Sequence, residues 1–327
     1  MRIKITDLRE QIVGLLKANL TDSQAAAVAD YLVWAEMTNN KTQGIVKMIG
    51  TEPIQSIVPE AEMKVVKDTK LSQIIDAGKN PAPLSATRAM DTAIQKANEH
   101  GFAIVGVRNT FSSNGAQAYY VEKIAREGLI GIMMSRSPAA ASAFGGIEPV
   151  FGTNPIGIAF PTNDDPLVFD AATSAMTFYG LVLAKTRGEQ IAEGVALDRE
   201  GNETTDPAAV MDGGSIRPFD KGYKGSGFAM LVEVLGGPLL SGAWIDNKTF
   251  DKEWGTVVMV IDPDLMAGRE EFKANVSDMI AQLKSARTKS GDTVRLPGET
   301  SKAAYHAALD SGELDIDDAV AKTLGIH

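Results

Sequence analysis

The chain has 327 residues, more than the roughly 250–300 at which a single hydrophobic core usually stops growing, so two lobes are expected. Its formal net charge of −10 makes nucleic acid and anionic membrane surfaces poor partners. The absence of cysteine excludes disulfides, thiolate catalysis and zinc–sulfur sites.

The N-terminal part is predicted to be helical. Apolar residues at helical spacing indicate helices over residues 7–20 and 22–37, with Thr21 or Asp22 as the N-cap of the second. The pattern breaks in the polar run 38–44, and a short helical stretch is expected over 45–49. Residues 63–67 have a strand-like composition, and 86–100 have a helical pattern.

Three short apolar runs, each followed by a polar turn, come next and are the most informative part of the chain. The runs cover 102–107, 129–134 and 167–169, and the turns cover 108–115, 135–138 and 170–174. A helix is expected after the first turn, over 116–125. Strand ends that pass through small polar residues into helix starts bind ligands in α/β proteins, because free backbone N–H groups there point at an anion. We therefore expect a ligand site built from these turns.

The remaining elements alternate between helices and strands. A helix over 175–187 ends at Gly188, which is a typical C-cap, and a polar, turn-rich stretch follows over 196–207. Residues 226–240 predict a helix of small residues with Met230, Leu231 and Val234 on an apolar face. A buried strand over 256–261, an amphipathic helix over 270–285 and two short surface helices within 301–326 complete the chain. It has no Gly-x-Gly-x-x-Gly, so the usual Rossmann fingerprint is missing.

Four motifs in these segments resemble those of a known family. They are Gly-Thr-Asn-Pro-Ile at 152–156, Asp-Ala-Ala-Thr-Ser at 170–174, Lys-Gly-Ser-Gly at 224–227 and Arg-Leu-Pro-Gly-Glu at 295–299. In this order they are similar to the type 2 malate/L-lactate dehydrogenases, a family that includes ureidoglycolate dehydrogenase, diketogulonate reductase and Δ1-piperideine-2-carboxylate reductase. The resemblance implies an α/β fold with a mixed β-sheet cofactor lobe, which is not a standard Rossmann domain. It implies a cofactor lobe over 81–240, and a substrate and dimerisation lobe formed by 1–80 and 241–327.

The resemblance also implies which residues hold a nicotinamide cofactor. Taken alone, the 109–115 turn would be an ordinary capped loop, Asp170 an N-cap, Arg136 a solvated surface charge and the 220–227 turn a solvated basic face. The family instead places cofactor contacts at Ser113, Asn114, Gly115, Ala116, Gln117, Ser137, Asp170, Ala171, Ala172, Tyr223, Lys224, Arg295, Pro297, Gly298 and Glu299. The last segment continues as Thr300-Ser301, where some NADP-using relatives have two arginines. Because these arginines are missing here, no positive charge would pair with a 2′-phosphate, and the resemblance favours NAD over NADP.

The chain departs from the family within residues 40–47. Relatives carry Asp-Ser-His-Gly and then an arginine: the histidine donates a proton, the serine relays it, and the arginine grips the substrate carboxylate. The matching positions are Thr42, Gln43 and Lys47. Lys47 keeps a cation without the guanidinium fork, whereas the amide of Gln43 cannot transfer a proton near neutral pH. A further family histidine, in the cofactor loop, corresponds to Ser113.

Two interpretations follow, because none of His100, His306 and His327 is placed to restore the motif. In the first, the chain is an NAD(P)-dependent dehydrogenase or reductase whose proton comes from Lys41, Lys47, Tyr119 or a water held by Thr42, Gln43 and Asp170. A cyclic imine substrate would ease this need, since an iminium carbon accepts hydride without a donor acting at that moment. In the second, the chain binds a cofactor with little or no turnover.

We favour the enzyme, because the replaced residues remain polar and suited to a site. It would transfer hydride between nicotinamide and C2 of a small carboxylate-bearing substrate, either a 2-hydroxy/2-oxo acid or a cyclic imino acid. Lys47 would hold the carboxylate, Thr153 would contact the substrate, and Thr42, Gln43 and Asp170 would take part in the chemistry. The resemblance implies a homodimer. No clustered ligands suggest a metal site. A charged N-terminus without an apolar signal region, and apolar runs far short of ~20 residues, predict a cytoplasmic protein with no membrane partner.

Overall fold

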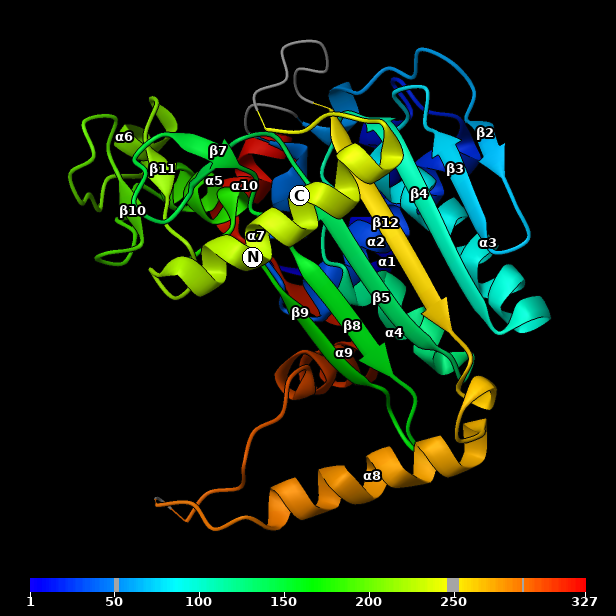
Figure 1. Cartoon of the computed structure of the whole chain (residues 1–327). Coiled ribbons are helices and arrows are strands. Elements are labelled where there is room, and N and C mark those ends of the chain that lie inside the picture. The colour runs from blue at the N-terminus through cyan, green and yellow to red at the C-terminus, as the bar shows by residue number, and fades with distance from the viewer. Residues whose placement is uncertain (50–52, 246–252, 290) are drawn as a thin grey trace.

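The computed structural model describes residues 1–49, 53–245, 253–289 and 291–327. Its centre is a seven-stranded sheet in the order β2-β3-β4-β12-β5-β8-β9 (Figure 1). Only the β3–β4 pair is parallel among these strands, so the sheet is mixed, as expected. The strands are β2 (Lys64–Asp68), β3 (Ser72–Asp76), β4 (Phe102–Thr110), β12 (Trp254–Ile261), β5 (Ile130–Arg136), β8 (Ile156–Phe160) and β9 (Leu167–Ala171).

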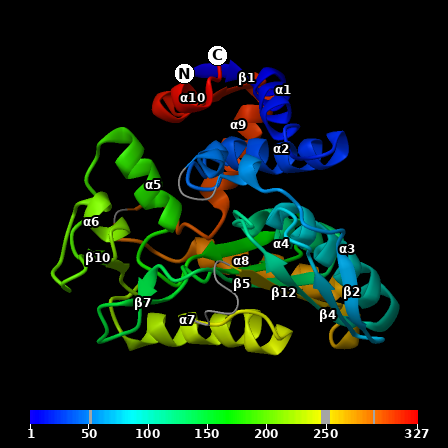
Figure 2. The ribbon, with the colours of Figure 1, turned by 90° about the horizontal axis from the view of Figure 1, so that it is seen from above.

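Helices cover both faces of this sheet. α3 (Ala82–His100) and α4 (Ala118–Arg126) pack on one face, and α7 (Tyr223–Gly236) packs on the other (Figure 2). α3 begins four residues before the predicted start, because Pro83 lies in its first turn, where a missing N–H costs no hydrogen bond. Small buried residues, such as Ala89 and Ala93, let α3 approach the sheet closely. α8 (Arg269–Ser285) runs along the side of the molecule and buries none of its residues (Figure 1).

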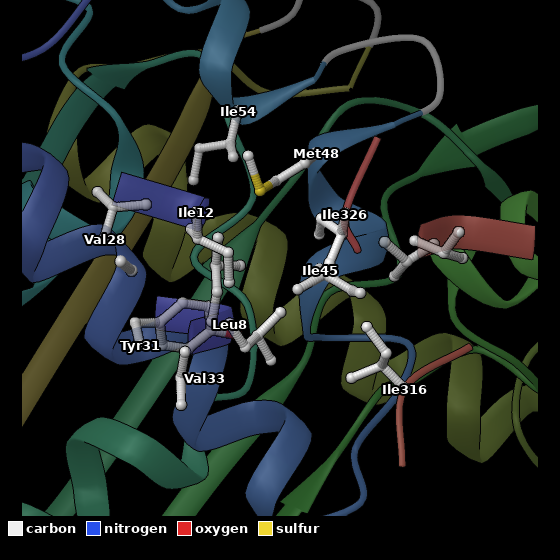
Figure 3. Packing of buried hydrophobic residues seen from close by; sticks show 14 of the residues in the cluster. Leu8, Ile12, Val28, Tyr31, Val33, Ile45, Met48, Ile54, Ile316 and Ile326 are labelled. Carbon is white, nitrogen blue, oxygen red and sulfur yellow. The ribbon is translucent and has the colours of Figure 1, made fainter. Parts of the chain in front are cut away.

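The N-terminal helices form a second layer together with the C-terminal ones. α1 (Ile5–Leu16) and α2 (Asp22–Met37) lie beside α9 (Glu299–Ser311) and α10 (Asp318–Leu324), and β1 (Arg2–Lys4) pairs with β13 (Glu313–Asp315), so the two termini are neighbours (Figure 2). Leu8 and Ile12 of α1 pack with Ile45, Ile316 and Ile326 in one apolar cluster (Figure 3). The predicted cap of α2 is confirmed, since Thr21 and Gln24 form a reciprocal capping box.

The third region extends beside the sheet. It consists of α5 (Phe178–Arg187), α6 (Pro207–Met211) and a four-stranded sheet in the order β10-β11-β6-β7. Those strands are β10 (Ala196–Leu197), β11 (Ser215–Ile216), β6 (Ala141–Ser142) and β7 (Pro149–Phe151). Short 3-10 turns are η1 (Ile45–Met48), η2 (Ile54–Ser56), η3 (Pro238–Leu240) and η5 (Pro263–Leu265). α5 ends as predicted at Gly188, whose φ is 71°.

The helix predicted over 226–240 exists as α7, followed by η3, but its apolar face does not point into the molecule. Met230, Leu231 and Val234 each expose about half of their surface. The division into lobes stays a prediction, and β12 of the proposed 241–327 segment lies in the middle of the main sheet. In the described part of the chain, no helix combines the length and apolar character needed to cross a bilayer.

Candidate active site

A cavity of about 490 Å³ opens where the turns of the main sheet meet the segment after α2. This size is in the usual range for small-ligand sites. The turns at 42–47, 113–116, 135–140 and 170–172 all contribute to its wall. The predicted site residues that line it are Thr42, Gln43, Lys47, Ser113, Asn114, Gly115, Ala116, Ser137, Thr153, Asp170, Ala171 and Ala172.

Buried Glu36 shapes the segment that carries Thr42, Gln43 and Lys47. Its Oε1 accepts a hydrogen bond from the backbone N–H of Ile45 at 2.9 Å, and its Oε2 lies 2.9 Å from Lys41 Nζ. Gly44 is required beside it, because a Cβ at that position would lie 2.0 Å from Glu36 Oε1. The chain therefore turns directly into η1, and η1 carries Lys47 to the cavity.

Lys47 is a buried cation without a carboxylate partner in the described part of the chain, and it is 4 % exposed. Its Nζ donates a hydrogen bond to Ser113 Oγ at 2.7 Å and lies 3.6 Å from the centroid of the Tyr179 ring. Burial lowers the pKa of Lys47 well below its usual value. The ammonium can therefore release a proton more readily than a solvated lysine.

The Ser113 turn is tied to the Lys47 segment through Tyr31. The Tyr31 hydroxyl accepts from the backbone N–H of Ala116 at 2.6 Å and donates to the carbonyl of Gln43 at 3.0 Å. Gly115 fits against that hydroxyl, since an added Cβ would lie 1.5 Å from it and the φ of Gly115 is 78°. The two turns are thus held in a fixed relation at the cavity.

Asp170 lies at the end of β9, in the cavity wall. Its Oδ2 accepts a hydrogen bond from the backbone N–H of Ala118 at 2.9 Å, and the N–H of Gln117 also stabilises the carboxylate. Burial outweighs these bonds and raises the pKa of Asp170 to about 6. This carboxyl group therefore changes its protonation state close to neutral pH.

Asn154 supports the part of the cavity wall that contains Ser137 and Thr153. Its Oδ1 accepts from the backbone N–H of Ser137 at 3.2 Å, and its Nδ2 donates to Glu233 Oε2 at 2.9 Å. Glu233 Oε1 in turn lies 3.2 Å from Arg136 Nε. The expectation that Arg136 would otherwise be a solvated surface charge is wrong, because it is 3 % exposed in this ion pair.

Some predicted cofactor residues lie outside the main cavity. Tyr223 and Lys224 are at the exposed start of α7, and Gln117 is fully buried with no hydrogen-bond partner for its side chain in the described ranges. Gly298 lines a smaller cavity of about 120 Å³ that shares Asn40 and Asp170 with the main one. Arg295, Pro297 and Glu299 line neither cavity.

The structure distinguishes among the alternative proton donors, because only some of them line the main cavity. Lys41 is paired with Glu36, and the Tyr119 hydroxyl accepts from Lys123 Nζ at 2.8 Å; neither lines the main cavity. His306 lines only the smaller cavity, and the other two histidines line neither. Lys47 and a water near Thr42, Gln43 and Asp170 remain as candidates. In the described part of the chain, no three histidine or carboxylate side chains group to hold a metal ion.

Residue-by-residue reading of the sequence missed several lining side chains. The Tyr179 ring lies under the Lys47 ammonium, and Phe178 and Trp254 also line the cavity. Tyr31 is also missed, although it joins two of the predicted turns. Their only signal in the sequence is proximity to predicted turns, as with Tyr179 five residues after Ser174.

The sequence matches the malate/L-lactate dehydrogenase family over residues 3–325. A malate dehydrogenase from Pyrococcus horikoshii is 34 % identical over 84 % of this chain and 79 % of its own length. A ureidoglycolate dehydrogenase (NAD(+)) from Escherichia coli O157:H7 is 31 % identical over 97 % of this chain and 93 % of its own length.

A solved structure shows the same architecture. The Δ1-piperideine-2-carboxylate reductase from Pseudomonas syringae pvar. tomato superposes with a TM-score of 0.84 at 26 % identity, covering 99 % of this chain and 98 % of that one. The family match and these relatives thus define a nicotinamide-dependent dehydrogenase or reductase, and the mixed-sheet fold agrees with that class. The chain belongs to the malate/L-lactate dehydrogenase family, whose members act on 2-hydroxy acids and cyclic imino acids. None of these findings supports the interpretation of a binding protein without turnover.

Proposed function

We propose that the enzyme transfers hydride between a nicotinamide and C2 of a small carboxylate-bearing substrate, a 2-hydroxy/2-oxo acid or a cyclic imino acid. The observation that carries this proposal is Lys47, the only cation among the described residues that line the main cavity. The net charge of −10 repels anions, so a buried ammonium is the feature that would draw a carboxylate in. One of its three N–H donors is used on Ser113, which leaves others for the substrate.

The nicotinamide group, when bound, supplies or accepts the hydride. We propose that Ser113 to Gln117, Ser137, Asp170 to Ala172, Tyr223, Lys224 and Arg295, Pro297, Gly298 and Glu299 hold the cofactor. Thr153 would contact the substrate, while Thr42, Gln43 and Asp170 orient it and any relay water. NAD is favoured over NADP, because the last cofactor segment continues as Thr300-Ser301 and lacks the two arginines of some NADP-using relatives. We also propose that the enzyme works in the cytoplasm.

The first test is oxidation of NADH and of NADPH against a panel of 2-oxo acids and cyclic imino acids. We expect turnover with at least one acid, a higher kcat/KM with NADH than with NADPH, and none with the corresponding neutral amides. The amides are the matched control, since they keep the reacting carbon and lose only the charge that Lys47 would bind. No turnover across the panel would contradict the proposal, and equal rates with amides would contradict the role of Lys47.

We further propose that the enzyme is a homodimer formed through the exposed face of α7. Phe228, Met230, Leu231 and Val234 are each about half exposed on this helix, and Leu239 continues the patch. Contiguous apolar surface of this kind marks an association site, and a second copy is the occupant that the family resemblance suggests.

Leu231→Glu should therefore dissociate the dimer, because each of the two symmetric contacts would bury an unpaired carboxylate at a cost of several kcal/mol. The measurement is molar mass by light scattering across a dilution series. Leu309→Glu is the control, since Leu309 is equally exposed on α9, away from the patch. A wild-type protein that is monomeric at every concentration would refute the proposal.

A further inference from the structure

We infer that Ser113 exchanges the proton with the oxygen at C2 of the substrate, and that Lys47 supplies this proton to Ser113. The inference rests on the proposed function and gives it a proton route that uses no histidine. Ser113 would be the catalytic residue that touches the reacting atom, and Lys47 would act both through Ser113 and on the carboxylate.

The geometry of this pair carries the inference. Lys47 Nζ lies 2.7 Å from Ser113 Oγ, a short hydrogen bond inside the wall of the main cavity. Ser113 Oγ also accepts from the backbone N–H of Gly115 at 3.1 Å. With both acceptor positions of the oxygen used by these donors, the hydroxyl proton is free to point into the cavity. Both side chains are at most 9 % exposed, so bulk water does not replace either bond.

No neighbouring charge in the described part of the chain neutralises Lys47. The elements packed against η1 are α2, α5, α10 and η2. Glu36 of α2 is occupied by Lys41 and by the N–H of Ile45, and Arg187 of α5 is paired with Asp317. The other charged or titratable groups on these elements and at their ends are Asp22, Asp30, Tyr31, Tyr179, Lys185, Asp318 and Lys322. Burial alone lowers the pKa of Lys47, which brings the ammonium towards the range in which a general acid works best.

The chemical step balances without a further reactant. In the reducing direction, the nicotinamide would supply the hydride to C2. The carbonyl π pair then moves to oxygen, and this oxygen takes the hydroxyl proton of Ser113. Ser113 Oγ takes a proton from the Lys47 ammonium, which becomes a neutral amine. The 2-oxo acid is reduced to the 2-hydroxy acid, the nicotinamide is oxidised, and solvent returns one proton to Lys47.

Ser113→Ala tests whether Ser113 transfers a proton or only supports the structure of the site. With a 2-oxo acid we expect kcat to fall by ~10²–10⁴-fold, because general acid catalysis is lost. KM and cofactor affinity should change by only a few-fold, because the substitution keeps the backbone groups through which this turn would hold the cofactor. With a cyclic imino acid in its iminium form the fall should be below about 10-fold, because the nitrogen already carries its proton. Equal losses with both substrate classes, or a matching loss of cofactor affinity measured by nicotinamide fluorescence, would overturn the inference.

Lys47→Arg tests the source of the proton. The guanidinium keeps a positive charge for the carboxylate, but it does not deprotonate near neutral pH. KM should stay within a few-fold of wild type, while kcat with a 2-oxo acid falls by ~10²–10⁴-fold. Retention of wild-type kcat would show that Lys47 supplies no proton.

A measurement without turnover distinguishes failure of this inference from failure of the proposed function. The wild-type protein is produced with lysine labelled with ¹³C at Cε, and the Lys47 signal is assigned by its absence in Lys47→Arg. We expect its NMR titration midpoint to lie well below that of the other lysines. A midpoint in the ordinary lysine range overturns the proton route even if the enzyme is active. A lowered midpoint in a protein that turns over no acid would refute the proposed function alone.

Discussion

Lys47→Met is expected to abolish turnover and, at the same time, to raise the free energy of unfolding. The ammonium is 4 % exposed, and its partners in the described part of the chain are a hydroxyl and an aromatic ring instead of a carboxylate. Replacing buried ionic groups by well-packed apolar ones often stabilises proteins by about 1–4 kcal/mol. We expect about 1–3 kcal/mol here, because Ser113 and Tyr179 already offset part of the desolvation of Lys47.

The increase in the free energy of unfolding of Lys47→Met should depend on pH in a defined direction. The pKa of Lys47 is lowered in the folded state, so the unfolded chain binds more protons between that pKa and the ordinary lysine value of 10.5. Stability of the wild type therefore rises with pH through this window. Below the folded pKa, the cost of burying the charge is fully present. The advantage of Lys47→Met should accordingly be largest at low pH and fade towards pH 10.5.

Urea denaturation of the protein without cofactor, at several pH values, measures this effect, and kcat measures the loss of function. Lys41→Met is the matched control, because Lys41 lies in the turn just before η1. Its ammonium is paired with Glu36, whose side chain is only 2 % exposed, so its removal leaves a buried carboxylate unpaired and should destabilise the protein. A Lys47→Met variant that is destabilised as well would show that the charge is well compensated in the fold.

Part of the candidate site could be predicted from the sequence, because the pattern of apolar and polar residues marks its turns clearly. Strand ends followed by small polar residues mark the segments at 113–116 and 170–172, and the structure places both at one cavity with Lys47. The contact between Lys47 and Ser113 could not be predicted in this way, because 66 residues separate them and no local pattern links them. Tyr179 was missed for the same reason.

For the fold, likewise, individual helices and strands could be predicted from the sequence, but their packing against one another could not. Apolar runs identified strands such as β12, but its insertion between β4 and β5 depends on packing over more than a hundred residues of chain. The apolar face of α7 was recognised, whereas its exposure was not. A hydrophobic face indicates burial without saying whether the covering surface belongs to the same chain.

Glu233→Ala should lower the free energy of unfolding by about 3–5 kcal/mol, because it leaves the Arg136 guanidinium buried without its carboxylate. Glu233 is 3 % exposed and accepts three hydrogen bonds from residues that the structure describes. They come from Arg136 Nε at 3.2 Å, Asn154 Nδ2 at 2.9 Å and the backbone N–H of Ile245 at 2.7 Å. Urea denaturation measures the loss.

Glu313→Ala is the control for that experiment. Its carboxylate pairs with Arg2 Nε at 2.6 Å, but the two side chains are 38 % and 66 % exposed. Exposed ion pairs contribute little, so we expect a loss below about 1 kcal/mol. Similar losses in the two variants would mean that burial does not set the strength of the Arg136 pair.

Glu233→Ala should also weaken cofactor binding at the active site, because Glu233 helps to hold Asn154. The Asn154 amide joins Glu233 to the backbone of Ser137, and both Ser137 and Thr153 line the cavity. Without the carboxylate, the amide loses one of the partners that hold its orientation, since its other Nδ2 bond goes to the carbonyl of Ala229. Cofactor affinity should therefore fall with stability in Glu233→Ala and stay unchanged in Glu313→Ala. If affinity is unchanged in both, Asn154 holds this wall without help from the ion pair.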